Sequence, residues 1–176
     1  KAIRRQRQMC IRDRLVCEQI RAIVNASIPV VAHLGMTPQS VNTLGGFKVQ
    51  GKTADAARQL LEDAKAVEEA GAFALVMECV PAKLAALVTK TLHIPTIGIG
   101  AGAGCDGQVL VYQDMLGMFS DYRPKFVRKF AEVGKVMQEA FASYRSEIQE
   151  GNFPTEEHSF AISDEVMAQL EQEAQA

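Results

Sequence analysis

The fold is decided by residues 73–81, which read Phe-Ala-Leu-Val-Met-Glu-Cys-Val-Pro. The apolar residues that lead this stretch predict a strand that is buried on both faces. The proline at its end favours the first turn of a helix. A strand of this kind, followed at once by a helix, is typical of a parallel sheet with crossover helices.

The same alternation of strand and helix continues on both sides of residues 73–81. Apolar runs predict three further strands, over 28–33, 94–99 and Val109–Val111. Helical spacing, with ends marked by Thr53, Gly71, Gly151 and Ser163, predicts helices over 15–26, 54–70, from Pro81, over 124–150 and after Ser163. We therefore expect an α/β fold with four βα units and its chemistry at the carboxyl ends of the strands.

Composition excludes several classes of protein. The 176 residues are 48% hydrophobic and 23% charged, as in an ordinary soluble domain, and the net charge of −2 argues against general nucleic-acid binding. No apolar run approaches the length of about 20 residues that a membrane span needs. Four scattered cysteines without a Cys-x-x-Cys pair favour reduced thiols and a cytoplasmic setting.

Glu78 is the strongest candidate for catalysis. It follows the apolar strand directly, so we expect it at the strand's carboxyl end, in surroundings that disfavour the charged form of a carboxyl group. Such a carboxylate suits a general base. The alternative is a structural carboxylate that is satisfied by a lysine or by the helix that starts at Pro81.

The histidines and lysines carry weaker predictions. His33 ends the first strand and opens the long polar loop 35–52, so it is either a substrate contact or acid/base residue, or a buried histidine bonded to backbone. We expect His93 to be a charge at a helix end and His158 not to be a zinc ligand, and Lys48 and Lys52 either meet an anion or are simply solvated.

The glycine-rich stretch 98–104 has two interpretations. Gly98, Gly100 and Ala103 match the dinucleotide pattern Gly-x-Gly-x-x-Ala, which would indicate a nicotinamide-dependent oxidoreductase. A strand rather than a helix is expected to follow, which disfavours that interpretation. The favoured alternative is a loop that brings the backbone of Gly100 and Gly102 close to a small ligand.

These loops together resemble one known family. The motifs are His33-Leu34-Gly35-Met36-Thr37-Pro38-Gln39-Ser40-Val41-Asn42, Gly45-Gly46-Phe47-Lys48-Val49-Gln50-Gly51, Glu78-Cys79-Val80-Pro81, Ile97-Gly98-Ile99-Gly100-Ala101-Gly102, Asp106-Gly107-Gln108, Pro124-Lys125-Phe126 and Glu156-Glu157-His158-Ser159-Phe160. From about Leu15 to Phe160 the chain is similar to the ketopantoate hydroxymethyltransferases.

The resemblance implies a fold and a domain division. The family fold is a (β/α)8 TIM barrel, of which residues 15–162 would form the last four units, an incomplete barrel. Residues 163–176 would be a helical tail. Residues 1–14, with six basic side chains and one acid, depart from the family pattern, and we expect them not to be native to it.

The resemblance also implies a reaction. The family transfers a one-carbon unit from 5,10-methylenetetrahydrofolate to the α-keto acid 3-methyl-2-oxobutanoate, through an enolate that Mg²⁺ stabilises. Glu78 matches the proton acceptor, and His33 matches a pocket histidine. The metal ligands would lie in a first half that the chain lacks, so no metal residue is expected here.

The resemblance implies a homo-oligomer, a decamer in the family. The alternative is that this chain alone is a non-catalytic half barrel whose open sheet edges and apolar helix faces drive association.

Overall fold

A four-stranded parallel sheet organises the protein. The structure is a computed structural model, which describes residues 15–37, 48–118 and 124–174. The strands are β1 (Val31–Gly35), β2 (Ala74–Glu78), β3 (Thr96–Ile99) and β4 (Gly107–Gln108), paired in the order β1-β2-β3-β4. This arrangement confirms the α/β class and the parallel sheet. Residues 1–14, which we expect to be foreign to the family, and residues 38–47 of the long polar loop lie outside the described residues.

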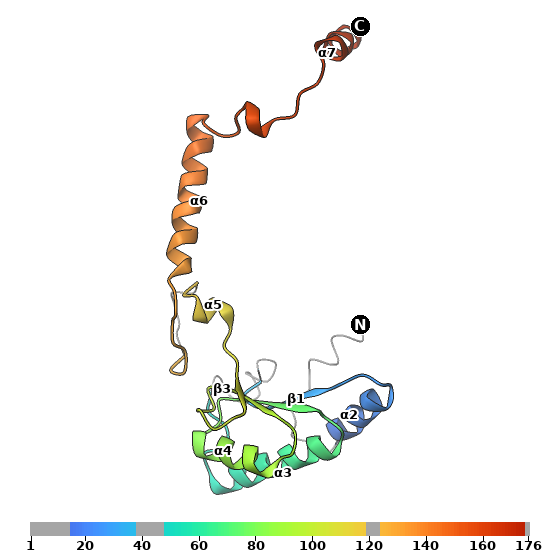
Figure 1. The fold of residues 1–176 in the computed structure, drawn as a ribbon, viewed down its shortest axis with the longest axis vertical. Helices are drawn as coiled ribbons and strands as arrows, with labels where there is room; N and C mark the ends of the chain where they lie inside the picture. Colours follow the sequence, from blue (N-terminus) through green and yellow to red (C-terminus); the bar gives the residue numbers. More distant parts are fainter. Residues whose placement is uncertain (1–14, 38–47, 119–123, 175–176) are drawn as a thin grey trace.

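Three helices cover one face of this sheet (Figure 1). They are α2 (Leu15–Asn25), α3 (Ala54–Glu69) and α4 (Ala82–Thr91). Between them and the sheet lies a core that includes Ile20, Leu60, Val67, Leu75, Met77 and Val88. Because side chains alternate along a strand, the residues between Leu75 and Met77 and on either side of them point to the other face, which these helices do not cover.

The helix ends follow the sequence signals. Thr53 caps α3, its hydroxyl accepting a hydrogen bond from the Ala56 N–H at 3.3 Å, and Gly71 takes the left-handed backbone (φ +99°) beyond the end of that helix. Pro81 precedes α4 as expected. Near the end of α3, Glu68 accepts hydrogen bonds from the backbone N–H groups of His93 and Ile94, at 2.6 and 2.9 Å, and so ties this helix to the segment that leads into β3.

The predicted position of the fourth strand, Val109–Val111, was wrong. Strand β4 is Gly107–Gln108, whereas Val109 and Val111 follow it and are both exposed. The Val109 N–H still donates to the Gly98 carbonyl at 3.0 Å, but β3 ends at Ile99 and the chain turns away at Gly100. Among the residues that the structure describes, a strand over 109–111 therefore finds no continuation of β3 to pair with, and α5 (Tyr112–Met115) follows directly.

The predicted long helix was wrong at its start. Helix α6 runs over Val133–Glu150 and not from residue 124. The N–H groups of Phe130 and Val133 donate to the carbonyls of Met115 and Leu116, at 2.8 and 2.9 Å, so this segment is held against the end of α5 rather than coiled into the helix. Gly151 (φ +74°) ends α6 as predicted.

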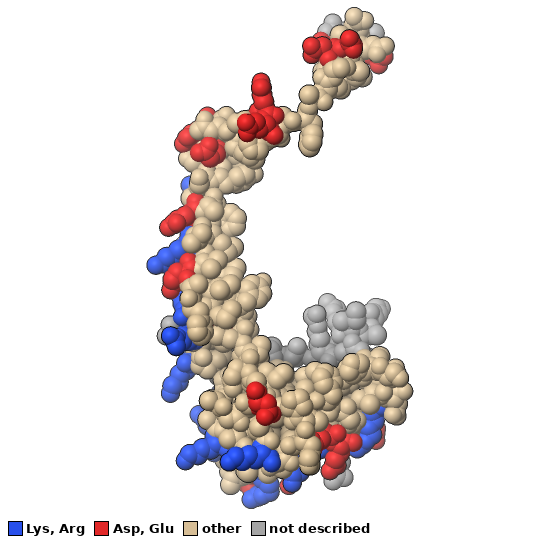
Figure 2. Space-filling view, viewed as in Figure 1, with Lys and Arg blue, Asp and Glu red and all other residues tan. Residues whose placement is uncertain are grey.

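Helix α6 and the residues after it extend away from the sheet (Figure 1). None of the residues of α6 is buried, and Phe141 is 65% exposed. Beyond it come a short 3-10 helix η2 (Glu156–His158) and α7 (Asp164–Glu173), which Ser163 caps. Figure 2 shows charged side chains along one side of α6, while the opposite side is largely uncharged. Within the described residues, no helix combines the length and the apolarity that a membrane span needs.

Candidate functional site

The site lies on the face of the sheet that α2, α3 and α4 leave open. His33 of β1 pairs in register with Val76, and Gly35 pairs with Glu78, the last residue of β2. Glu78 in turn pairs with Ile99 of β3. Parallel strands bring their carboxyl ends to one edge, so the two sequence candidates, Glu78 and His33, come from neighbouring strands to the same place.

Glu78 and His33 are in contact. The Nε2 atom of His33 lies 3.3 Å from the Oε2 atom of Glu78, and the side chain of Glu78 is only 12% exposed. This separation is within ion-pair range, but the pair does not meet the geometry of a hydrogen bond. The buried Nε2 atom therefore has no hydrogen-bond partner within the part of the chain that the structure describes. A nearly buried carboxylate that lies beside a polar ring on the open face of the sheet is suited to accepting a proton.

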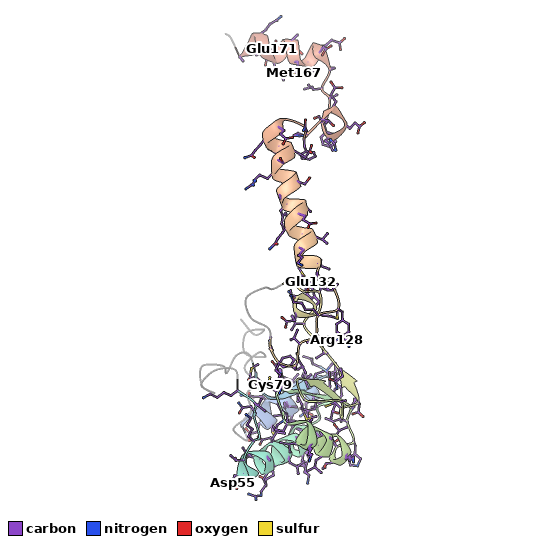
Figure 3. The ribbon with its side chains drawn as sticks, turned by 90° about the vertical axis from the view of Figure 1, so that its left-hand side faces the viewer. Asp55, Cys79, Arg128, Glu132, Met167 and Glu171 are labelled. Carbon is purple, nitrogen blue, oxygen red and sulfur yellow. The ribbon has the colours of Figure 1, made fainter. Side chains whose placement is uncertain are left out.

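Backbone hydrogen bonds from three segments fix the position of Glu78. Its carbonyl accepts from the Met36 N–H at 2.8 Å, the Cys79 N–H donates to the Ile99 carbonyl at 2.9 Å, and the Cys79 carbonyl accepts from the Gln50 N–H at 2.8 Å. Figure 3 places Cys79 on the side of the sheet from which the chain continues towards Arg128 and α6. Burial, and then the charge of Glu78, raise the pKa of the Cys79 thiol.

The glycine-rich loop packs against protein atoms. A Cβ built on Gly100 would lie 2.7 Å from the ring of Phe126, and one on Gly102 would collide with the side chain of Ala82. Both residues also have positive φ, at +64° and +78°. Close packing is therefore a sufficient reason for these glycines, and contact of their backbone with a small ligand stays a prediction.

The glycine-rich loop does not have the structure that a dinucleotide-binding site needs, so the nicotinamide interpretation was wrong. A dinucleotide fingerprint needs a helix that opens within the glycine loop. Residues 100–106 instead form turns and bends that lead into β4. Asp106 fixes the end of this loop, because its carboxylate accepts hydrogen bonds from the N–H and the hydroxyl of the buried Thr96, at 2.8 and 3.0 Å. Hydrogen bonds from the backbone and then from the side chain of Thr96 lower the pKa of Asp106.

The remaining candidates lie outside this site. His93 follows the end of α4, and its Nδ1 atom lies 3.6 Å from Glu68. His158 bonds the hydroxyl of Thr155 at 2.8 Å and packs its ring against Phe153. Lys48 and Lys52 are exposed. Across residues 15–37, 48–118 and 124–174, no three His, Cys, Asp or Glu side chains gather where they could hold a metal ion.

A comparison with protein families decides between the interpretations of this edge. The model of the ketopantoate hydroxymethyltransferases matches residues 10–156. The chain belongs to the ketopantoate hydroxymethyltransferase family. This match confirms the resemblance seen in the sequence. The fold of the family is a TIM barrel, and this chain has four parallel strands.

Several relatives are similar to the chain over most of its length. The 3-methyl-2-oxobutanoate hydroxymethyltransferases of Clostridium novyi and Enterococcus faecalis are 67% and 64% identical to the chain over 155 residues, which are 88% of this chain and 56% of each relative. That of Clostridium acetobutylicum is 58% identical over 156 residues, 89% of this chain and 56% of the relative. The chain therefore spans about half the length of these relatives.

Sequence reasoning missed the parts of the site that are made by the backbone. The positive φ of Cys79 (+53°) has no residue signal, because cysteine rarely adopts that conformation. The Thr96–Asp106 interaction was missed as well, although Asp106 stands in the motif Asp106-Gly107-Gln108. Only the pairing of β3 with β4 shows that Asp106 returns to the start of β3.

Proposed function

We propose that this chain carries the base of an enzyme that transfers a hydroxymethyl group from 5,10-methylenetetrahydrofolate to 3-methyl-2-oxobutanoate, giving 2-dehydropantoate for pantothenate and coenzyme A synthesis. The observation that carries the proposal is the nearly buried Glu78 carboxylate, 3.3 Å from His33, at the carboxyl edge of the sheet. Membership of the family and relatives of that name support it.

The proposed reaction begins with proton removal. The Glu78 carboxylate takes the proton from the carbon next to the carbonyl of the keto acid, and the electron pair of that C–H bond forms an enolate. One water molecule releases the one-carbon unit: both C–N bonds of the folate's methylene bridge break, the two nitrogens take the hydrogens of the water, and tetrahydrofolate leaves, while the oxygen stays on the carbon as formaldehyde. The enolate carbon then forms a C–C bond with this carbon, and the resulting alkoxide takes the proton that Glu78 holds. Glu78 suits the first step because its largely buried position keeps bulk water away from the carboxylate, which therefore meets the substrate proton directly.

The residues described here do not fit a Mg²⁺ site. Magnesium prefers several oxygen ligands in near-octahedral geometry. The described residues offer no group of three or more side chains with metal-ligating atoms, and Glu78 is joined in its contact by a histidine, not by a second carboxylate. No metal ligand is therefore assigned among residues 15–37, 48–118 and 124–174.

The open face of the sheet supports an incomplete barrel. We propose that the four strands are the last four of eight, that the chain alone does not turn over substrate, and that the whole protein is a homo-oligomer. Apolar side chains left exposed at the sheet and on α6, among them Val31, Phe73, Phe141 and Tyr144, support association with further chain. The same exposure supports the second candidate, a non-catalytic piece that only associates.

The test of the base is exchange of the keto acid's proton. The assay uses the whole enzyme that includes this chain, supplied with magnesium. We expect it to exchange the C3 hydrogen of 3-methyl-2-oxobutanoate with deuterium, as followed by NMR, and we expect this exchange to depend on Glu78. Glu78→Gln keeps the shape of the side chain but removes the base, and it should slow exchange by about a hundred- to ten-thousand-fold. Glu69→Gln, an exposed position on α3, is the control.

The outcomes separate the two candidates. Exchange that Glu78→Gln leaves unchanged contradicts the assignment of the base. Turnover by the chain alone, measured as release of tetrahydrofolate, contradicts its proposed inactivity. No exchange by the full protein, together with association of the chain in sedimentation, favours the non-catalytic alternative.

A further inference from the structure

The backbone directly after Glu78 is bent in a way that its residue type disfavours. Among the described residues, Ser27 and Cys79 are the non-glycine residues with positive φ, at +61° and +53°. Ser27 lies just beyond the end of α2, where a left-handed residue is common. Cys79 follows a strand instead, so no helix end accounts for its conformation. Such strain persists only where the surroundings impose it, and it concentrates at functional sites.

The surroundings of Cys79 do impose the bend. Its N–H is bonded to Ile99 of β3 and its carbonyl to Gln50, while the carbonyl of the preceding Glu78 is bonded to Met36, which follows β1. Both polar groups of the Glu78–Cys79 peptide, and the carbonyl of the peptide that follows it, are thus held by three different segments.

The neighbouring strand bends at the matching position. Gly35, the register partner of Glu78, has φ +91°, and a Cβ on it would collide with the Glu78 carbonyl and lie 2.9 Å from the side chain of Val80. The ends of β1 and β2 therefore bend together in close contact. This close approach of β1 and β2 is independent of the positive φ at Cys79. It also indicates that the backbone next to Glu78 is held in one conformation.

We propose that Cys79 is a positioning residue, whose left-handed backbone holds the Glu78 carboxylate against His33. The proposal rests on the function proposed for Glu78. It assigns the role to the backbone conformation at position 79 and not to the thiol. A residue that tolerates the left-handed region, such as glycine or asparagine, should then replace cysteine, whereas a β-branched residue of similar size should not.

The test is a set of paired substitutions read at His33. The chain is labelled so that NMR reports the imidazole resonances of His33, and their displacement by Glu78→Gln is measured. The same displacement is then measured in the backgrounds Cys79→Gly, Cys79→Asn and Cys79→Val. The displacement is large only while the carboxylate lies beside the ring, so it reports how closely Glu78 is held to His33. Its change between backgrounds is the coupling between positions 78 and 79.

We expect the displacement to be kept in the glycine and asparagine backgrounds and to fall to about half or less in the valine background. Urea unfolding midpoints should follow the same order, with Cys79→Val lowest. A full displacement in a folded Cys79→Val chain overturns the proposal. Loss of the displacement in both Cys79→Gly and Cys79→Asn also overturns the proposal. This second outcome can be measured even if Cys79→Val does not fold.

This experiment does not depend on catalysis. Suppose that the His33 displacement follows the predicted order across the Cys79 backgrounds, but Glu78-dependent deuterium exchange of the keto acid is absent. The positioning role of Cys79 would then stand, and the proposed function would be rejected. The converse result, exchange without the predicted order, would reject the role of Cys79 alone.

Discussion

Removal of the Glu68 carboxylate should destabilise the folded protein, because this side chain joins α3 to the segment that enters β3. Its Oε1 atom accepts the N–H groups of His93 and Ile94, at 2.6 and 2.9 Å, and the side chain is 21% exposed. A hydrogen bond to a charged group contributes about 1.5–3 kcal/mol net. Since both bonds share one oxygen and water reaches part of the group, we expect Glu68→Ala to lower the free energy of unfolding by about 2–3 kcal/mol.

The pH dependence gives a sharper test of the same interaction. Burial raises the pKa of Glu68, but the hydrogen bonds from His93 and Ile94 outweigh it, so the net pKa is lowered. A carboxyl group with a lowered folded-state pKa stabilises the fold above its unfolded pKa, and this contribution is lost as pH falls through the folded value. The difference in stability between the native chain and Glu68→Gln should therefore be present at pH 7 and shrink below the ordinary glutamate value of about 4.3.

The assay is urea unfolding followed by circular dichroism at a series of pH values. Glu69→Gln is the matched control, because Glu69 is the exposed neighbour on the same helix. A difference for Glu68→Gln that does not change between pH 7 and pH 3, or a cost for Glu68→Ala no larger than that of the control, would refute the reasoning.

Two further predictions concern the glycine loop and the thiol beside the proposed base. Gly104→Ala should cost about 1–3 kcal/mol in urea unfolding through overpacking, because its Cβ would lie 2.6 Å from that of Ala86. Gly151→Ala has open space and should cost only about 1 kcal/mol, for its left-handed backbone, so a smaller cost for Gly104→Ala than for Gly151→Ala contradicts the packing argument. At Cys79, burial and then the charge of Glu78 raise the thiol pKa, so Glu78→Gln should lower that pKa part of the way to its ordinary value. Alkylation of Cys79 at pH 7.5, followed by peptide mass mapping, should then become several-fold faster, and an unchanged rate would show that the charge of Glu78 does not reach the thiol.

Local patterns were sufficient for most of the elements around the site. The run Ala74–Met77 predicted its strand because a strand buried on both faces must be continuously apolar. Thr53, Gly71, Gly151 and Ser163 mark helix ends through their own backbone and side-chain chemistry, which depends on near neighbours in the chain. The same reasoning placed Glu78 at a strand's carboxyl end.

Local patterns failed where a distant partner decides the structure. Val109–Val111 has the composition of a strand, but β3 ends before it could pair with those residues. Residues 124–132 have helical spacing, yet the amides of Phe130 and Val133 bond to the end of α5 instead. Neither partner can be read from the segment itself, because the pairing depends on how the whole chain is arranged.

The sequence by itself determined the alternation of strands and helices, the family, and the identity of the candidate base, since each depends on residue types and their spacing. Only the tertiary structure decided that His33 lies 3.3 Å from Glu78, that the glycines pack against Phe126 and Ala82, and that the chain bends at Cys79. The physical reason is that these contacts join segments far apart in sequence, which the register of neighbouring parallel strands brings to one edge.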